Sequence, residues 1–106
     1  MLDITPVMRY ITVVIKSFGC KRTALVFTGQ VPKGFPSDIL TVARRKLRML
    51  DSAIRLDDLR VPPSNHLEAL KGDRIGQHSI RINDQWRLCF VWQDGAAHGV
   101  EIVDYH

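Results

Sequence analysis

Four side chains in the second half of the chain are of the types needed to cut RNA without a metal: Glu68, Lys71, Arg87 and His106. Such cleavage takes a base that removes the 2′-hydroxyl proton, cations that stabilise the charged phosphorane, and an acid that protonates the leaving 5′-oxygen. Spacing alone does not bring the four together, because residues three apart, as Glu68 and Lys71 are, need not face one way in a strand.

The composition predicts one small globular domain with a basic surface. The chain has 106 residues, with 15 Lys and Arg against 11 Asp and Glu, a net charge of +4. A pI near 9.4 favours a polyanionic partner, most often a nucleic acid. No apolar stretch approaches the roughly 20 residues that span a bilayer, and residues 1–15 lack the pattern of a signal peptide. We therefore expect a cytoplasmic protein that does not bind membranes.

Neither the cysteines nor the histidines show the spacing of a metal site. Cys20 and Cys89 lie far apart, and we expect both to be reduced thiols, with Cys89 a core residue of a strand. His66, His78 and His98 suit surface or turn positions. We expect no metal.

Two helices are expected in the first half of the chain. Residues 19–28 suit one short helix, which ends at Gly29. A second helix has Ser37 as its N-cap and a stripe of apolar residues at helical spacing: Ile39, Leu40, Ala43, Leu47 and Leu50. Its opposite side carries Arg44, Arg45 and Arg48. This basic face suits either a polyanionic partner or simple exposure to solvent.

The remaining pattern alternates as in strands. Residues 10–18 are rich in β-branched side chains, and further strands are expected over 77–82, 86–92 and 100–103. Turns are expected at residues 83–85 and 94–95. In the strand over 86–92 one face carries Trp86, Leu88, Phe90 and Trp92, which we assign to the core, and the other carries Arg87, Cys89 and Val91. The predicted fold is α+β, with two N-terminal helices packed on a small antiparallel sheet.

Several of these segments together resemble a known family. The string Leu-Glu-Ala-Leu-Lys-Gly-Asp-Arg at 67–74, Ser-Ile-Arg-Ile at 79–82, Gln-Trp-Arg-Leu at 85–88 and the terminal Asp-Tyr-His resemble the HigB-type toxins of the RelE superfamily. These proteins belong to bacterial type II toxin–antitoxin systems. The resemblance covers residues 15–106, a single RelE/HigB-like toxin domain, and makes residues 1–14 an N-terminal extension.

The resemblance implies a ribosome-dependent mRNA endonuclease that halts translation and needs no cofactor. It also implies neutralisation by a HigA-type helix-turn-helix antitoxin, through which alone the toxin contacts operator DNA. Two alternatives stay open. One is a ribosome- or RNA-binding inhibitor that has lost catalysis, and the other is a corepressor that acts with its antitoxin.

The resemblance also assigns roles to residues. Lys71 matches a phosphate-contacting lysine, and Arg87 matches an arginine that stabilises the transition state. Asp104, Tyr105 and His106 match the functional C-terminus, with Tyr105 suited to stacking on a base.

Other assignments are less direct. Family members can carry a histidine where this chain has Glu68, so the general base is either Glu68 or His106. Ribosomal RNA would be contacted by basic side chains of the second helix and of the later segments: Arg44, Arg45, Arg48, Arg74 and Arg81. From its neighbours alone, Arg87 could instead pair with Asp84 or stack on Trp86.

Overall fold

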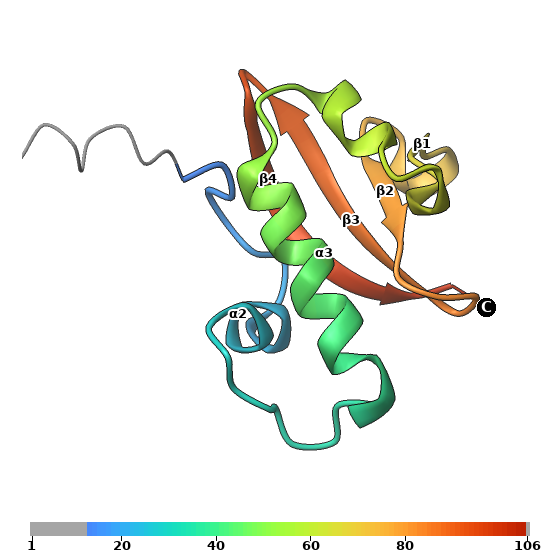
Figure 1. The fold of residues 1–106 in the computed structure, drawn as a ribbon. Coiled ribbons are helices and arrows are strands. Elements are labelled where there is room, and N and C mark those ends of the chain that lie inside the picture. The colour runs from blue at the N-terminus through green and yellow to red at the C-terminus, as the bar shows by residue number, and fades with distance from the viewer. Residues whose placement is uncertain (1–12, 106) are drawn as a thin grey trace, which may run out of the picture.

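A four-stranded antiparallel sheet with helices on one face forms the fold (Figure 1). The computed structural model describes residues 13–105. The strands lie in the order β1–β2–β3–β4, which is also their order in the sequence: β1 Glu68–Ala69, β2 His78–Arg81, β3 Trp86–Gln93 and β4 Ala96–Asp104. The helices are α2 (Lys21–Phe27) and α3 (Leu40–Ser52). The predicted α+β class with an antiparallel sheet is confirmed.

The helical half contains one main helix, α3, and a much shorter one, α2. The helix α3 has 13 residues, whereas α2 has only seven, because Cys20 is still extended and Gly29 ends the turn with a φ of 95°. Ser37 was expected as an N-cap, which is wrong. It lies inside the short 3-10 turn η1 (Ser37–Ile39), and no side chain caps the start of α3.

Further 3-10 turns connect α3 to the sheet and the first two strands to each other. They are η2 (Leu56–Arg60), η3 (Pro63–Asn65) and η4 (Gly72–Arg74). Within residues 13–105 no helix is long and apolar enough to cross a membrane.

Both predicted turns between strands are confirmed. Asp94 and Gly95 link β3 to β4 with φ values of 52° and 74°, the left-handed pair that a two-residue type I′ turn requires. In the turn between β2 and β3, the Asn83 side-chain oxygen accepts hydrogen bonds of 2.8 Å from the backbone N–H groups of Gln85 and Trp86. These short turns fix the antiparallel register of the sheet.

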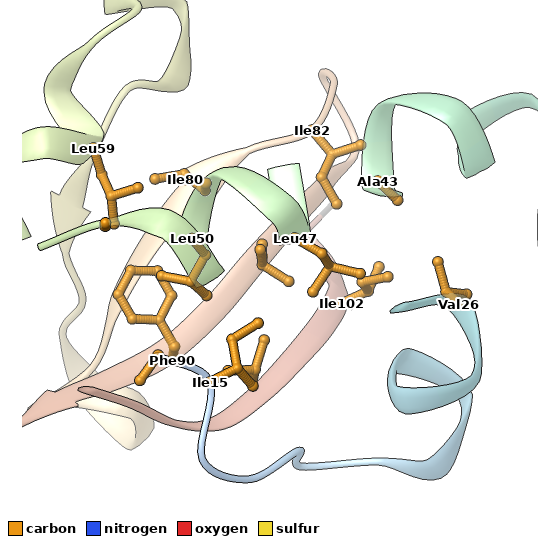
Figure 2. Close-up of a cluster of buried hydrophobic side chains, with 14 of the residues drawn as sticks. Ile15, Val26, Ala43, Leu47, Leu50, Leu59, Ile80, Ile82, Phe90 and Ile102 are labelled. Atoms are coloured by element: carbon orange, nitrogen blue, oxygen red, sulfur yellow. The ribbon is translucent and has the colours of Figure 1, made fainter. Parts of the chain in front are cut away.

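The hydrophobic core lies between α3 and the sheet (Figure 2). Leu88 and Phe90 of β3 are fully buried there, and Trp86 and Trp92 pack partly buried against the same cluster. The predicted core face of β3 is therefore confirmed. The other members of the cluster that Figure 2 labels come from almost every element: Ile15, Val26, Ala43, Leu47, Leu50, Leu59, Ile80, Ile82 and Ile102.

The described part of the expected strand over residues 10–18 runs along the edge of β4. It makes two isolated parallel bridges, Ile15 with Ala97 and Phe18 with Val100, instead of a regular strand. Residues 10–12 lie outside the described part of the chain.

This edge segment is tied to both α3 and β4. Asp51 of α3 accepts hydrogen bonds from the backbone N–H groups of Val14, at 3.1 Å, and Ile15, at 2.9 Å. The Val14 carbonyl accepts one from Ala97 at 2.9 Å, and Val14 is only 5% exposed. The extension over residues 1–14 stays a prediction, but its last residue is part of the packed fold.

Candidate active site

One residue from each strand stands in register across the sheet, on the face that points away from α3. Glu68 pairs with Ser79, Ser79 with Cys89, and Cys89 with Glu101. Side chains alternate along a strand, and Leu88 and Phe90 face α3, so this row and the neighbouring Arg87 face the other way. We call the surface formed by the row and Arg87 the outer face.

Arg87 is the most tightly held side chain of the outer face. Its Nε donates a hydrogen bond of 2.7 Å to Ser79 Oγ, and its Nη2 donates one of 2.5 Å to the His66 carbonyl. Glu68 Oε1 lies 3.7 Å from Nε, and the Arg87 side chain is only 12% exposed. The alternative pairing with Asp84 is not observed, since Asp84 pairs with a different arginine. The guanidinium is therefore fixed in place before any ligand binds.

A second arginine lies at the opposite edge of the outer face. Arg74, from η4, reaches across to β4, where its Nη1 lies 3.5 Å from Glu101 Oε1. The same nitrogen donates a hydrogen bond of 3.0 Å to Gln77 Oε1. The outer face thus carries two arginines, each beside a carboxylate: Arg87 with Glu68, and Arg74 with Glu101.

Cys89 and Tyr105 lie near both arginines and contact each other. Burial raises the pKa of the fully buried Cys89 thiol. Arg74, the Tyr105 hydroxyl and Arg87 lower this pKa, but their effects are smaller than that of burial. Desolvation and the adjacent Cys89 raise the pKa of Tyr105, whereas Arg74 and Arg87 lower it by a smaller amount. Since both arginines act on both groups, their charges converge on one area. Both Cys89 and Tyr105 are neutral at physiological pH.

The outer face can therefore bind a phosphodiester and stabilise the negative charge that develops on it. Guanidinium groups match phosphate oxygens in shape and charge, and a preorganised cation stabilises a phosphorane without reorganising. No group of three His, Cys, Asp or Glu suited to hold a metal ion occurs among residues 13–105.

The other predicted catalytic residues have different positions. Lys71 is exposed and immediately precedes η4, the turn that carries Arg74. Asp104 pairs with Trp86 on the opposite side of β4 from Tyr105, and it accepts a hydrogen bond of 3.1 Å from Gln85 Nε2. His106 lies outside the described residues. The structure brings Glu68, Arg87 and Tyr105 to the outer face and turns Asp104 away from it.

The five arginines expected to contact RNA do not form one surface. Arg44 donates hydrogen bonds to the carbonyls of Val26 (3.2 Å) and Gln30 (2.9 Å), so it holds α3 against the end of α2. Arg45 and Arg48 are exposed on α3, behind the sheet as seen from the outer face. The fourth, Arg81, pairs with Asp84 at 2.5 Å, and the fifth, Arg74, lies in the candidate active site.

Sequence reasoning missed three contributors to the site: Ser79, Glu101 and the His66 carbonyl. Alternation along β3 places Cys89 beside Arg87, but the partners across the sheet depend on a register that only the folded chain sets. A backbone carbonyl gives no signal in the residue types at all.

Comparisons with known proteins identify the family of the chain. Residues 25–106 match the family model described as the RelE-like toxin of type II toxin–antitoxin system HigB. "Toxin HigB-1" of Vibrio cholerae is 50% identical over 62 residues, which are 58% of this chain and 65% of that protein, just under two thirds of its length. "Endoribonuclease HigB" of Proteus vulgaris is 34% identical over 92 residues, 87% of this chain and 99% of that protein. As the resemblance predicted, the chain belongs to the HigB-like family of RelE-like toxins of type II toxin–antitoxin systems.

Proposed function

We propose that this toxin is a metal-independent endoribonuclease that cuts mRNA on the ribosome in the cytoplasm and so inhibits translation. The observation that carries the proposal is the fixed guanidinium of Arg87, held by Ser79, Glu68 and the His66 carbonyl. Membership of the HigB-like family supports it, as does the similarity to a protein named as an endoribonuclease.

The reaction is an internal transfer. The 2′-oxygen attacks the adjacent phosphorus as a base removes its proton, and the bond from phosphorus to the 5′-oxygen breaks as an acid protonates that oxygen. The products are a 2′,3′-cyclic phosphate, which can open to a 3′-phosphate, and a new 5′-hydroxyl end. In this scheme Arg87 stabilises the phosphorane, and Lys71 contacts a phosphate of the RNA.

The base is Glu68 or His106, and Tyr105 has another role. Because its pKa is raised, the Tyr105 hydroxyl stays protonated at physiological pH and cannot remove a proton as a phenolate. Its half-exposed ring can stack on a base, and its hydroxyl can donate a hydrogen bond. Asp104 supports the terminal segment, because it pairs with Trp86 at the end of β4 and accepts a hydrogen bond from Gln85.

The family and the charge support the proposed partners. A helix-turn-helix antitoxin of the HigA type neutralises the toxin, and the toxin reaches operator DNA only through that antitoxin. Arg45 and Arg48, exposed on α3, contact ribosomal RNA. Arg81, at the end of β2, contacts it as well.

The test is primer extension on a defined mRNA translated in vitro, with wild type, Arg87→Ala and Arg87→Lys. Wild type should give new 5′ ends at A-site codons only when ribosomes are present, and both variants should lose at least about 100-fold of that activity. Arg60→Ala is the matched control, because Arg60 forms an exposed pair with Asp57 in η2. Glu68→Gln and His106→Ala, tested singly, identify the base. Blocked translation without new ends would overturn the proposal in favour of a binding inhibitor.

A further inference from the structure

We propose that Glu101 is a positioning residue of this site: it holds the Arg74 guanidinium over the Cys89–Tyr105 end of the outer face, where Arg74 binds a phosphate of the RNA as the second arginine. This inference rests on the proposed function. It concerns the half of the outer face opposite Arg87.

Arg74 and Arg87 are held in different ways. Arg87 is anchored partly by backbone, through the His66 carbonyl, and is 12% exposed. Arg74 is 31% exposed, and the partners that hold its guanidinium are side chains, Glu101 at 3.5 Å and Gln77 at 3.0 Å. It also stands on a 3-10 turn of only three residues. The direction of Arg74 therefore depends on the side chains of Glu101 and Gln77, whereas that of Arg87 also depends on a backbone carbonyl.

Glu101 lies beside Gly19 of the edge segment. Gly19 lies so close that a Cβ built on it would stand 3.2 Å from Glu101 Oε1 and 3.3 Å from Glu101 Cβ. Its backbone N–H donates a hydrogen bond of 2.8 Å to the Val100 carbonyl, which keeps it against β4. The carboxylate therefore lies between the edge segment and Arg74.

The position of Arg74 fits a phosphate contact. Glu101 stands opposite Cys89 in the sheet, and Cys89 contacts Tyr105, so an arginine that reaches Glu101 lies near both groups. The charge of Arg74 acts on both Cys89 and Tyr105, as that of Arg87 does. An RNA strand whose base stacks on Tyr105 would place its phosphates between two guanidinium groups.

Glu101 could also act in the opposite direction, because a carboxylate repels a phosphate. The two roles predict opposite effects of removing it. If Glu101 positions Arg74, its loss slows cleavage. If it only competes with phosphate for Arg74, its loss speeds cleavage.

The experiment measures single-turnover cleavage of a defined mRNA on programmed ribosomes for wild type, Glu101→Ala, Glu101→Gln, Arg74→Ala and the double variant Arg74→Ala/Glu101→Ala. Loss of a charge-assisted contact to phosphate corresponds to about 10-fold or more in rate for Arg74→Ala. We expect Glu101→Ala to lose about 3- to 10-fold, and Glu101→Gln to recover part of that loss by keeping a hydrogen-bond acceptor. Adding Glu101→Ala to Arg74→Ala should change nothing further.

The control is Asp57→Ala, which breaks the exposed ion pair of Asp57 with Arg60 and should leave cleavage unchanged. Thermal unfolding of every variant separates loss of folding from loss of activity. Faster cleavage by Glu101→Ala, or a full additional loss in the Arg74→Ala background, would overturn the positioning role.

Failure of the proposed function would look different, since wild type itself would then cut nothing. In that case the same five proteins are compared for affinity to ribosomes carrying an mRNA with 2′-deoxynucleotides in the A site. Non-additive losses of affinity for Arg74 and Glu101 would still support the inference, and additive losses would overturn it.

Discussion

The guanidinium of Arg87 donates a hydrogen bond of 2.5 Å to the backbone carbonyl of His66, 21 residues earlier in the chain. His66 ends η3 in a left-handed conformation, with a φ of 45°. The arginine proposed to stabilise the transition state is thus oriented by a turn that carries no catalytic side chain. Anything that moves this turn should alter activity without touching the RNA.

Asn65 is the residue that holds the turn. It is fully buried, accepts a hydrogen bond of 2.5 Å from Lys46 Nζ, and donates to the carbonyls of Leu59 (3.1 Å) and Val61 (3.4 Å). Asn65→Ala leaves the buried Lys46 ammonium and Leu59 carbonyl without their partner, at a cost of about 1–3 kcal/mol for each unsatisfied group. We expect a loss of about 2–4 kcal/mol in the free energy of unfolding, measured in urea.

Cleavage should fall as well, because the neighbouring His66 carbonyl would no longer hold Arg87. Ser64→Ala, an exposed position of the same turn, is the control and should change neither quantity. Full activity in an Asn65→Ala protein that is measurably destabilised would show that the turn does not orient Arg87.

Cys89 should control the titration of Tyr105. The pKa of Tyr105 is raised first by desolvation and then by the charge and hydrogen bond of Cys89. Cys89→Ala should therefore lower the pKa of Tyr105 toward its ordinary value of 10.0. The measurement is ultraviolet difference titration in a Tyr10→Phe background, which leaves Tyr105 as the remaining one of 2 tyrosines. An unchanged titration midpoint would rule out the Cys89 contact.

The strands were predictable where one face had a clear pattern. In β3 the alternation of large apolar residues with Arg87 and Cys89 identified both faces, and Asp94-Gly95 identified the hairpin turn. The two-residue strand β1 was missed, because Glu68 and Ala69 are both exposed and show no alternation. The expected strand at the start failed for another reason. In its described part Val13 is exposed, and Val14 and Ile15 are buried by packing against β4 and α3 rather than by regular pairing.

The site was predictable only through resemblance. Residue types pointed to Glu68 and Arg87, but their proximity follows from the pairing of Glu68 with Ser79 and the reach of Arg87 across β2. Strand alternation does separate Asp104 from Tyr105, since neighbours in an extended strand face opposite ways. The two residues are therefore adjacent in the terminal motif, but their side chains point to opposite faces of the sheet.

Asp58 should make the toxin less stable in acid. Its carboxylate accepts hydrogen bonds from the backbone N–H groups of Arg55 (3.0 Å) and Ile54 (2.9 Å), and these lower its pKa below the ordinary 3.8. A carboxyl whose pKa is lower in the folded state adds stability above its unfolded pKa, and that stability is lost as pH falls through the folded value. The free energy of unfolding of Asp58→Asn should therefore fall less than that of wild type between pH 5 and pH 2 (about the span over which such carboxyls titrate). An equal fall in the two proteins would show that the hydrogen bonds to the Asp58 carboxylate do not cause the loss of stability in acid.

Gly19→Ala should act on the site through Glu101. The added methyl would stand 3.0 Å from the Gly99 carbonyl oxygen and 3.2 Å from Glu101 Oε1, so the carboxylate must shift. We expect a loss of about 1 kcal/mol or more in stability from the tight backbone contact. Single-turnover cleavage should also slow in the wild-type background, but not in the Arg74→Ala background. An equal slowing in both would mean that Gly19 acts on the fold alone.

The stability of the fold should depend on the edge segment from Val14 onward. Val14 is 5% exposed, and its backbone N–H and carbonyl bond to Asp51 and Ala97. A protein without residues 1–14 should be less stable than one without residues 1–12, because burying a valine side chain is worth about 1.5–3 kcal/mol and two hydrogen bonds are lost as well. Urea unfolding of the two truncated proteins gives this difference directly. Equal stabilities would mean that the packed fold begins at Ile15, the first residue of the family resemblance, and that Val14 belongs to the extension.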